Sequence, residues 1–155
     1  MAEAAPERRS GVSGLDEGML LGTLVALAGY LLPWFRKGES FSWSYSGLEY
    51  ATLSDGGGWT LITFGWLLLA LGAAPFARRS VEAAMAGVVA AVGALFTSLA
   101  VVAASFATIG KQTALNPVAQ LPFGIGLPLL AAGLGLLLAT SIRAIVRGEA
   151  GVARG

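Results

Sequence analysis

The feature of the sequence that most limits its possible folds is a long apolar run, from Ala83 to Gly110, that contains no charged side chain. As a helix rising roughly 1.5 Å per residue it would be about 40 Å long, which exceeds the roughly 30 Å hydrocarbon core of a bilayer. Only 12% of the chain is charged and 55% is hydrophobic, whereas about a quarter of a soluble domain is charged. The run and the composition together predict an integral membrane protein.

The same run is rich in small residues at four-residue spacing. One helical face carries Ala86, Ala90, Ala94 and Ser98. A second series of this kind, near the end of the chain, consists of Ala131, Gly135 and Ala139. Because lipid tails are as apolar as leucine, membrane helices associate through close backbone approach, which small residues permit. We therefore predict that these two faces are helix-packing surfaces and that they pack against each other.

Four apolar segments could each form a transmembrane helix, at about 18–35, 59–77, 82–110 and 122–146. Gly126 and Pro128 weaken the first turns of the last segment, so we expect its helix to start late, near Leu127. Ser80, with Glu82 close behind it, is a suitable N-cap for the third helix. The short connection there makes the second and third helices antiparallel neighbours. The predicted fold class is an all-α integral membrane protein, an antiparallel bundle of four transmembrane helices.

The two ends of the chain differ in composition from this transmembrane domain, which we place at residues 18–147. Residues 1–17 are polar and contain Pro, Gly and Ser, which predicts a disordered N-terminal segment or, alternatively, a short surface helix. Residues 148–155 are predicted to form a flexible C-terminal tail.

The loop at 36–58 contains the alternating stretch FSWSYS, in which aromatic residues and serines point to opposite sides. This period of two is typical of a strand. Because Ser46-Gly47 can form a turn and Leu48 and Tyr50 continue the alternation, we predict a small extracytoplasmic β-hairpin. The candidate partner-binding residues are Trp34, Phe41, Trp43, Tyr45 and Tyr50. Tryptophan and tyrosine are enriched at binding hot spots; the alternative is that they form an aromatic belt at the membrane interface.

Lysine and arginine are divided unevenly between the two ends of the predicted spans. One side carries Arg8, Arg9, Arg78, Arg79, Arg143, Arg147 and Arg154, and the other carries Arg36, Lys37 and Lys111. Because cytoplasmic loops are enriched in these residues, we predict a multi-pass protein of the plasma or inner membrane with both termini in the cytoplasm. The loop at 36–58 then lies outside.

The chain contains neither cysteine nor histidine. This excludes disulfides, haem ligation by histidine, iron–sulfur ligation and zinc sites built from those residues. No charged residue lies in the middle of a predicted span, although proton relays and most ion-coupled transporters need one there. The remaining mid-span polar groups are hydroxyls, on Thr23, Thr63, Thr97, Ser98, Ser105, Thr140 and Ser141. We expect these to bond backbone carbonyls or a neighbouring helix; the alternative is a polar track through the membrane.

Trp34, Gly47-Leu48 and Tyr50 are similar to the Trp…Gly-Leu-Trp part of the loop signature of the claudin and peripheral-myelin-protein group. The chain departs from that pattern because it lacks the paired loop cysteines, has a shorter Trp-to-Gly spacing and has Glu49 before the last aromatic residue. The resemblance implies a left-handed four-helix bundle whose outer sheet makes lateral or cell-to-cell contacts.

These observations predict a non-catalytic membrane protein with no cofactor and no metal. Its expected role is that of a structural or accessory subunit, which contacts the lipid bilayer and either other membrane proteins or further copies of itself. The net charge of +1 gives no reason to expect a nucleic-acid partner. The alternative function is a small channel or transporter subunit that works as an oligomer.

Overall fold

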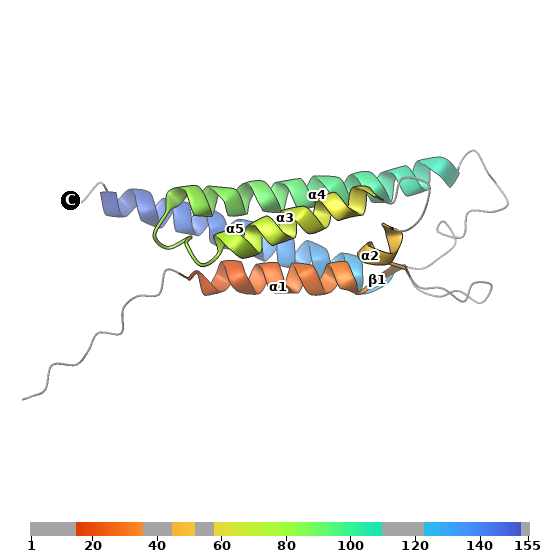
Figure 1. Ribbon diagram of the computed structural model, residues 1–155, viewed down its shortest axis with the longest axis horizontal. Coiled ribbons are helices and arrows are strands. Elements are labelled where there is room, and N and C mark those ends of the chain that lie inside the picture. Colours follow the sequence, from red (N-terminus) through yellow and green to blue (C-terminus); the bar gives the residue numbers. More distant parts are fainter. Residues whose placement is uncertain (1–14, 36–44, 52–57, 110–122, 153–155) are drawn as a thin grey trace, which may run out of the picture.

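The described part of the chain forms an elongated helical bundle with a small β element at one end (Figure 1). The computed structural model describes residues 15–35, 45–51, 58–109 and 123–152. The long helices are α1 (Glu17–Leu31), α3 (Trp59–Ala73), α4 (Val81–Ile109) and α5 (Gly126–Val152). The short elements are β1 (Pro33–Phe35), β2 (Tyr45–Ser46) and α2 (Gly47–Tyr50).

Two of the helices contain stretches that are long and apolar enough to cross a membrane, Val81–Ala103 in α4 and Gly126–Gly148 in α5. The other two, α1 and α3, are apolar but have only 15 residues each. The described part of the chain is therefore mostly helical and has two potential membrane spans.

The start of α1 is ordered, although we predicted disorder through residue 17. The Asp16 carboxylate accepts a hydrogen bond from the Met19 backbone N–H at 2.9 Å, which caps the helix. The helix ends at Leu31, before the predicted limit of residue 35. Leu32 precedes Pro33, whose ring disfavours helical backbone in the residue before it, and Leu32 is extended, with ψ of 156°.

The connection between α3 and α4 confirms the predicted cap at Ser80. The Ser80 hydroxyl accepts from the Ala83 N–H at 3.2 Å and donates to the Glu82 carboxylate at 2.6 Å.

Helix α5 starts at Gly126, in agreement with the predicted late start. It continues to Val152, so residues 148–152 are helical and do not belong to a flexible tail.

The β element differs from the predicted hairpin. Strands β1 and β2 pair antiparallel, with Pro33 opposite Ser46 and Phe35 opposite Tyr45. Residues 47–50 form a helical turn and no return strand, because Ser46 and Glu49 form a capping box: the Ser46 hydroxyl accepts from the Glu49 N–H and the Glu49 carboxylate accepts from the Ser46 N–H. The alternating residues 41–44 lie outside the described part of the chain.

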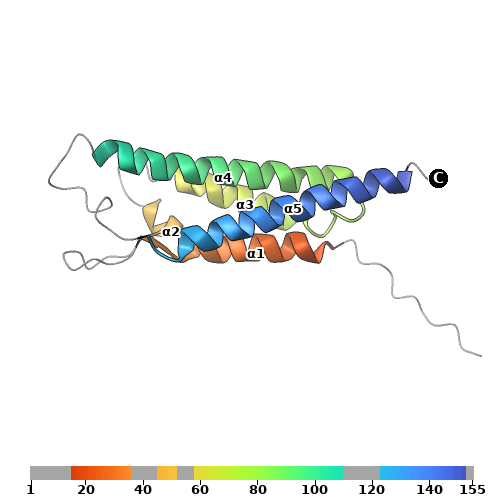
Figure 2. The same ribbon diagram turned by 180° about the vertical axis from the view of Figure 1, so that it is seen from behind.

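The tightest helix contact joins α1 and α5, which Figures 1 and 2 show lying side by side. A Cβ atom placed on Gly22 would lie 2.6 Å from the Leu137 backbone nitrogen. Cβ atoms on Gly29 and Gly133 would meet the backbones of Leu130 and Ala26 in the same way. These glycines bring the two backbones into direct contact. We predicted that α5 makes its close contact with α4 through Ala131, Gly135 and Ala139, but the glycine contacts lie on another face of α5 and have α1 as their partner.

Candidate functional site

Buried hydroxyl groups are the main polar feature inside the bundle, and most of them bond to their own helix. The side chains of Thr23, Thr97, Ser98 and Thr140 donate to backbone carbonyls three or four residues earlier. The Thr63 and Thr97 hydroxyls also bond each other at 2.8 Å and so join α3 to α4. These contacts agree with the expected packing role. The side chain of Ser105 lies outside the described part of the chain.

Ser141 is the exception among these hydroxyls. Its side chain is fully buried, and its Oγ atom has no hydrogen-bond partner. It packs against Gly87 of α4, where an added Cβ atom would lie 2.5 Å from the Ser141 oxygen and from the Met19 methyl group. Gly87 therefore provides the space in which α1, α4 and α5 meet.

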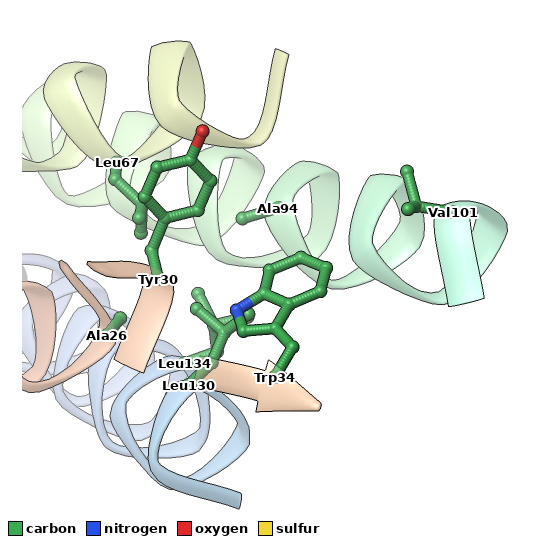
Figure 3. Close-up of a cluster of buried hydrophobic side chains, with 8 residues drawn as sticks. All are labelled: Ala26, Tyr30, Trp34, Leu67, Ala94, Val101, Leu130 and Leu134. Atoms are coloured by element: carbon green, nitrogen blue, oxygen red, sulfur yellow. The ribbon is translucent and has the colours of Figure 1, made fainter. Parts of the chain in front are cut away.

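An aromatic cluster closes the end of the bundle that holds β1 (Figure 3). Tyr30 and Trp34 are both fully buried and meet edge to face, with ring centroids 6.2 Å apart. The Tyr30 ring also stacks on Phe64 of α3 at 5.6 Å. The Trp34 indole N–H donates to the Gly29 carbonyl at 3.2 Å. Gly47 lies directly on the two rings, since a Cβ atom there would be 2.7 Å from Tyr30 and 2.9 Å from Trp34.

The cluster changes the role of Trp34, which we predicted to be a partner-binding residue. Because its side chain has no exposed surface, it anchors β1 to the bundle and is not available to a partner. Tyr45 lies in β2 and Tyr50 ends α2, but their side chains, like all of Phe41 and Trp43, lie outside the described part. Sequence reasoning missed Tyr30 and Gly47, because Tyr30 lies in α1 whereas Trp34 lies in β1, beyond the end of that helix.

The two predicted helix-packing faces have different environments. On α4, Ala90 and Ala94 are fully buried and Ser98 is 5% exposed, while Ala86 is partly buried against the same core. This face points to the centre of the bundle, where it meets residues of α1, α3 and α5. The face on α5 is outside the core: its members Ala131, Gly135 and Ala139 are all exposed.

A shallow apolar groove of ≈ 110 Å³ lies beside that exposed face, between α4 and α5. Its walls are formed by Ala91, Val92 and Leu95 of α4 and by Ala131, Leu134, Gly135 and Leu138 of α5. A Cβ atom on Gly135 would have no heavy atom within 4 Å. The groove is therefore a surface at which the backbone of α5 is open to close approach from outside.

In the described part of the chain, most charged side chains lie at or near helix ends, and Arg143 lies further inside α5. The Arg78 Nε atom lies 3.8 Å from the Asp16 carboxylate, and the Asp16 N–H donates to the Ala74 carbonyl at 3.1 Å. These contacts join the start of α1 to the end of α3. Among the side chains that the structure describes, no Asp, Glu, Lys or Arg is buried, and the described residues contain no group of three acids that could hold a metal ion.

The geometry thus offers one candidate site, the small-residue groove between α4 and α5, and it offers a contact surface with no chemically reactive group. The chain matches no known family model, no curated protein and no solved structure.

Proposed function

We propose that the chain is a non-catalytic accessory protein of the membrane and that the groove between α4 and α5 receives a helix of another subunit. In this proposal α1, α3, α4 and α5 all cross the bilayer as an antiparallel bundle, with both termini in the cytoplasm. The outer β element then lies on the far side of the membrane. The positive-inside distribution of Arg78, Arg79, Arg143 and Arg147 supports this orientation.

The observation that carries the proposal is the open surface at Gly135. Small residues at four-residue spacing drive membrane helices together because they let backbones approach. In this bundle the contact of that kind between α1 and α5 is made by other glycines, so the series at Ala131, Gly135 and Ala139 remains exposed. The hydroxyl groups support the alternative channel function less well, because Thr23, Ser98 and Thr140 donate to carbonyls of their own helices.

The resemblance to the claudin group supports a related use for the outer segment. In that group, an outer sheet makes lateral contacts between copies. Here the short sheet of β1 and β2 is held on the bundle by Trp34 and Gly47. We include lateral contacts through this segment in the proposal as a second, weaker interface.

The test is cross-linking in native membranes, followed by gentle detergent extraction, for the natural chain and the variant Gly135→Leu. A Cβ atom at this position meets no heavy atom within 4 Å, so we expect a leucine to point away from the bundle and to block close approach from outside. We expect the amount of cross-linked complex to be lower in the variant by about tenfold or more, which corresponds to a loss of roughly 1.4 kcal/mol of association free energy.

The matched control is Gly65→Leu on α3, since a Cβ atom there is equally free of neighbours. This variant should retain the complex. If the natural chain gives only monomers, or if both variants reduce cross-linking equally, the groove is not the interface.

A further inference from the structure

The four helices of the bundle overlap over a height that is shorter than an ordinary bilayer. Helices α1 and α3 have 15 residues each, so each is about 22 Å long at roughly 1.5 Å per residue. The hydrocarbon core of a typical bilayer is about 30 Å thick. Helix α4 has 29 residues and α5 has 27, which makes both of them about 40 Å or longer.

The extra length of α4 and α5 does not lengthen the region in which all four helices lie side by side, because these two helices extend beyond it at opposite ends. Figure 1 shows α4 continuing past α3 at the end that holds β1, and α5 continuing past α1 at the other end. Figure 2 shows the same arrangement from behind. The part of the bundle in which all four helices lie side by side is thus limited by α1 and α3.

Contacts at both ends establish the register of α1 against α5. At the inner end Gly18 lies against Thr140, and at the outer end Gly126 lies against the Leu32 carbonyl. The same interval along both antiparallel helices separates these contacts, about 21 Å of helix. Neither helix can therefore slide along the other to cover a thicker layer.

Charged and aromatic residues lie at the two ends of the short region in which the helices overlap. On α5, the stretch from Gly126 to Ile142 contains no charge, and it is about 25 Å long; exposed Arg143 follows it. Trp59 starts α3 and Phe76 lies in the turn that follows its end at Ala73, and each of these side chains is 60% exposed. Aromatic rings at such positions are typical of the membrane interface.

We propose that the face formed by α1, α3 and α5 fits a hydrocarbon layer of about 25 Å and thins a thicker bilayer around it. This inference depends on the proposed four-span arrangement. Its partner is the lipid itself, of a kind with short acyl chains. The alternative response to mismatch, tilting, suits a helix that is too long for the layer, so it cannot relieve a helix that is too short.

The test measures the relative affinity of the purified chain for phosphatidylcholines that differ only in acyl-chain length, from about 14 to about 22 carbons. Brominated lipids that quench tryptophan fluorescence report this affinity, and exposed Trp59 is in contact with them. We expect the highest affinity below about 18 carbons and a loss of about threefold or more at the longest chains. A maximum at the longest chains, or no dependence on length, would overturn the proposal.

Two variants of α5 form a matched pair for the same measurement. In Arg143→Leu the charge-free stretch extends to Val146, so its length rises to about 31 Å, and the preferred acyl chain should become longer. In Arg147→Leu the same side chain is replaced one turn further on, while Arg143 still ends the stretch, so the preference should not change. An equal response of the two variants would show that Arg143 does not mark the edge of the layer.

A separate labelling experiment distinguishes failure of this inference from failure of the four-span arrangement. Because the chain has no cysteine, Trp59→Cys and Phe76→Cys each introduce a single thiol near one end of α3. An impermeant maleimide added to sealed vesicles should label only one of the two variants. If it labels both, α3 does not cross the membrane and both proposals fall. If it labels one but long acyl chains are preferred, only the thickness inference is wrong.

Discussion

Helix α5 has two faces rich in small residues, and the bundle uses them differently. The face containing Gly126 and Gly133 meets α1 backbone to backbone, so an added Cβ atom at either glycine would clash. The face containing Gly135 is bordered by a groove and would accept a Cβ atom freely. Gly133 and Gly135 are only two residues apart, yet one is buried in a helix contact and the other is exposed. A small residue thus permits two helices to pack closely, but it does not determine which helix is the partner.

The largest loss of stability is expected for Gly133→Leu, which tests whether the two faces of α5 are packed differently. A leucine side chain there would overlap the backbone of Ala26, and backbone cannot move aside as a flexible side chain does. We expect a loss of about 3 kcal/mol or more in the free energy of unfolding, the range typical of severe overpacking. Thermal unfolding in detergent, followed by circular dichroism, measures the change.

The control for that prediction is Gly135→Leu, which should alter the unfolding free energy of the isolated chain by less than about 0.5 kcal/mol. Equal destabilisation by the two variants would mean that the two faces of α5 are equally packed, which would contradict the difference between Gly133 and Gly135.

An intermediate loss of stability is expected for Gly47→Ala, at the end of the bundle that holds β1 and α2. The new methyl group would press on the rings of Tyr30 and Trp34, which are held by each other and by Phe64. We expect a destabilisation of about 1–2 kcal/mol, because rigid rings can move only slightly. Gly58→Ala is the control, since its Cβ atom would meet nothing. Unchanged stability in Gly47→Ala would show that α2 is not seated on the aromatic cluster.

The smallest effect is expected for the hydroxyl pair that joins α3 to α4. A double-mutant cycle with Thr63→Val and Thr97→Val should give a coupling free energy of about 0.6 kcal/mol, as for other hydrogen bonds between membrane helices. The value is small because Thr97 also has a partner in its own helix, the Gly93 carbonyl at 2.9 Å. Coupling above about 2 kcal/mol would mean that this bond, and not backbone packing, holds the two helices together.

Local sequence signals identified several helix ends, although α1 and α3 end before the predicted limits of residues 35 and 77. The Ser80 cap, the proline after Leu32 and the weak first turns near Gly126 were all readable, because each acts through the backbone of its own neighbourhood. The prediction of a return strand at residues 47–50 was wrong, since it relied on the alternation of side chains. The capping box between Ser46 and Glu49 satisfies backbone groups directly, and it prevails over that pattern.

The candidate site was only partly predictable. Ala131, Gly135 and Ala139 were identified as a contact surface by their spacing, but their exposure was not. Trp34 was taken for a surface residue because tryptophan is common both at interfaces and in cores. Its ring meets nearby Tyr30, which in turn stacks on Phe64 of α3, and Gly47 comes from a separate part of the chain.

By itself, the sequence determined that the chain forms apolar helices with small residues along their faces and charges at their ends, since composition and spacing along a single helix are enough for that. Only the tertiary structure decided which glycines meet, and that the short helices α1 and α3 limit the height of the bundle. The physical reason is that partner choice depends on how the surfaces of two helices fit together, and no periodicity within one helix contains that information.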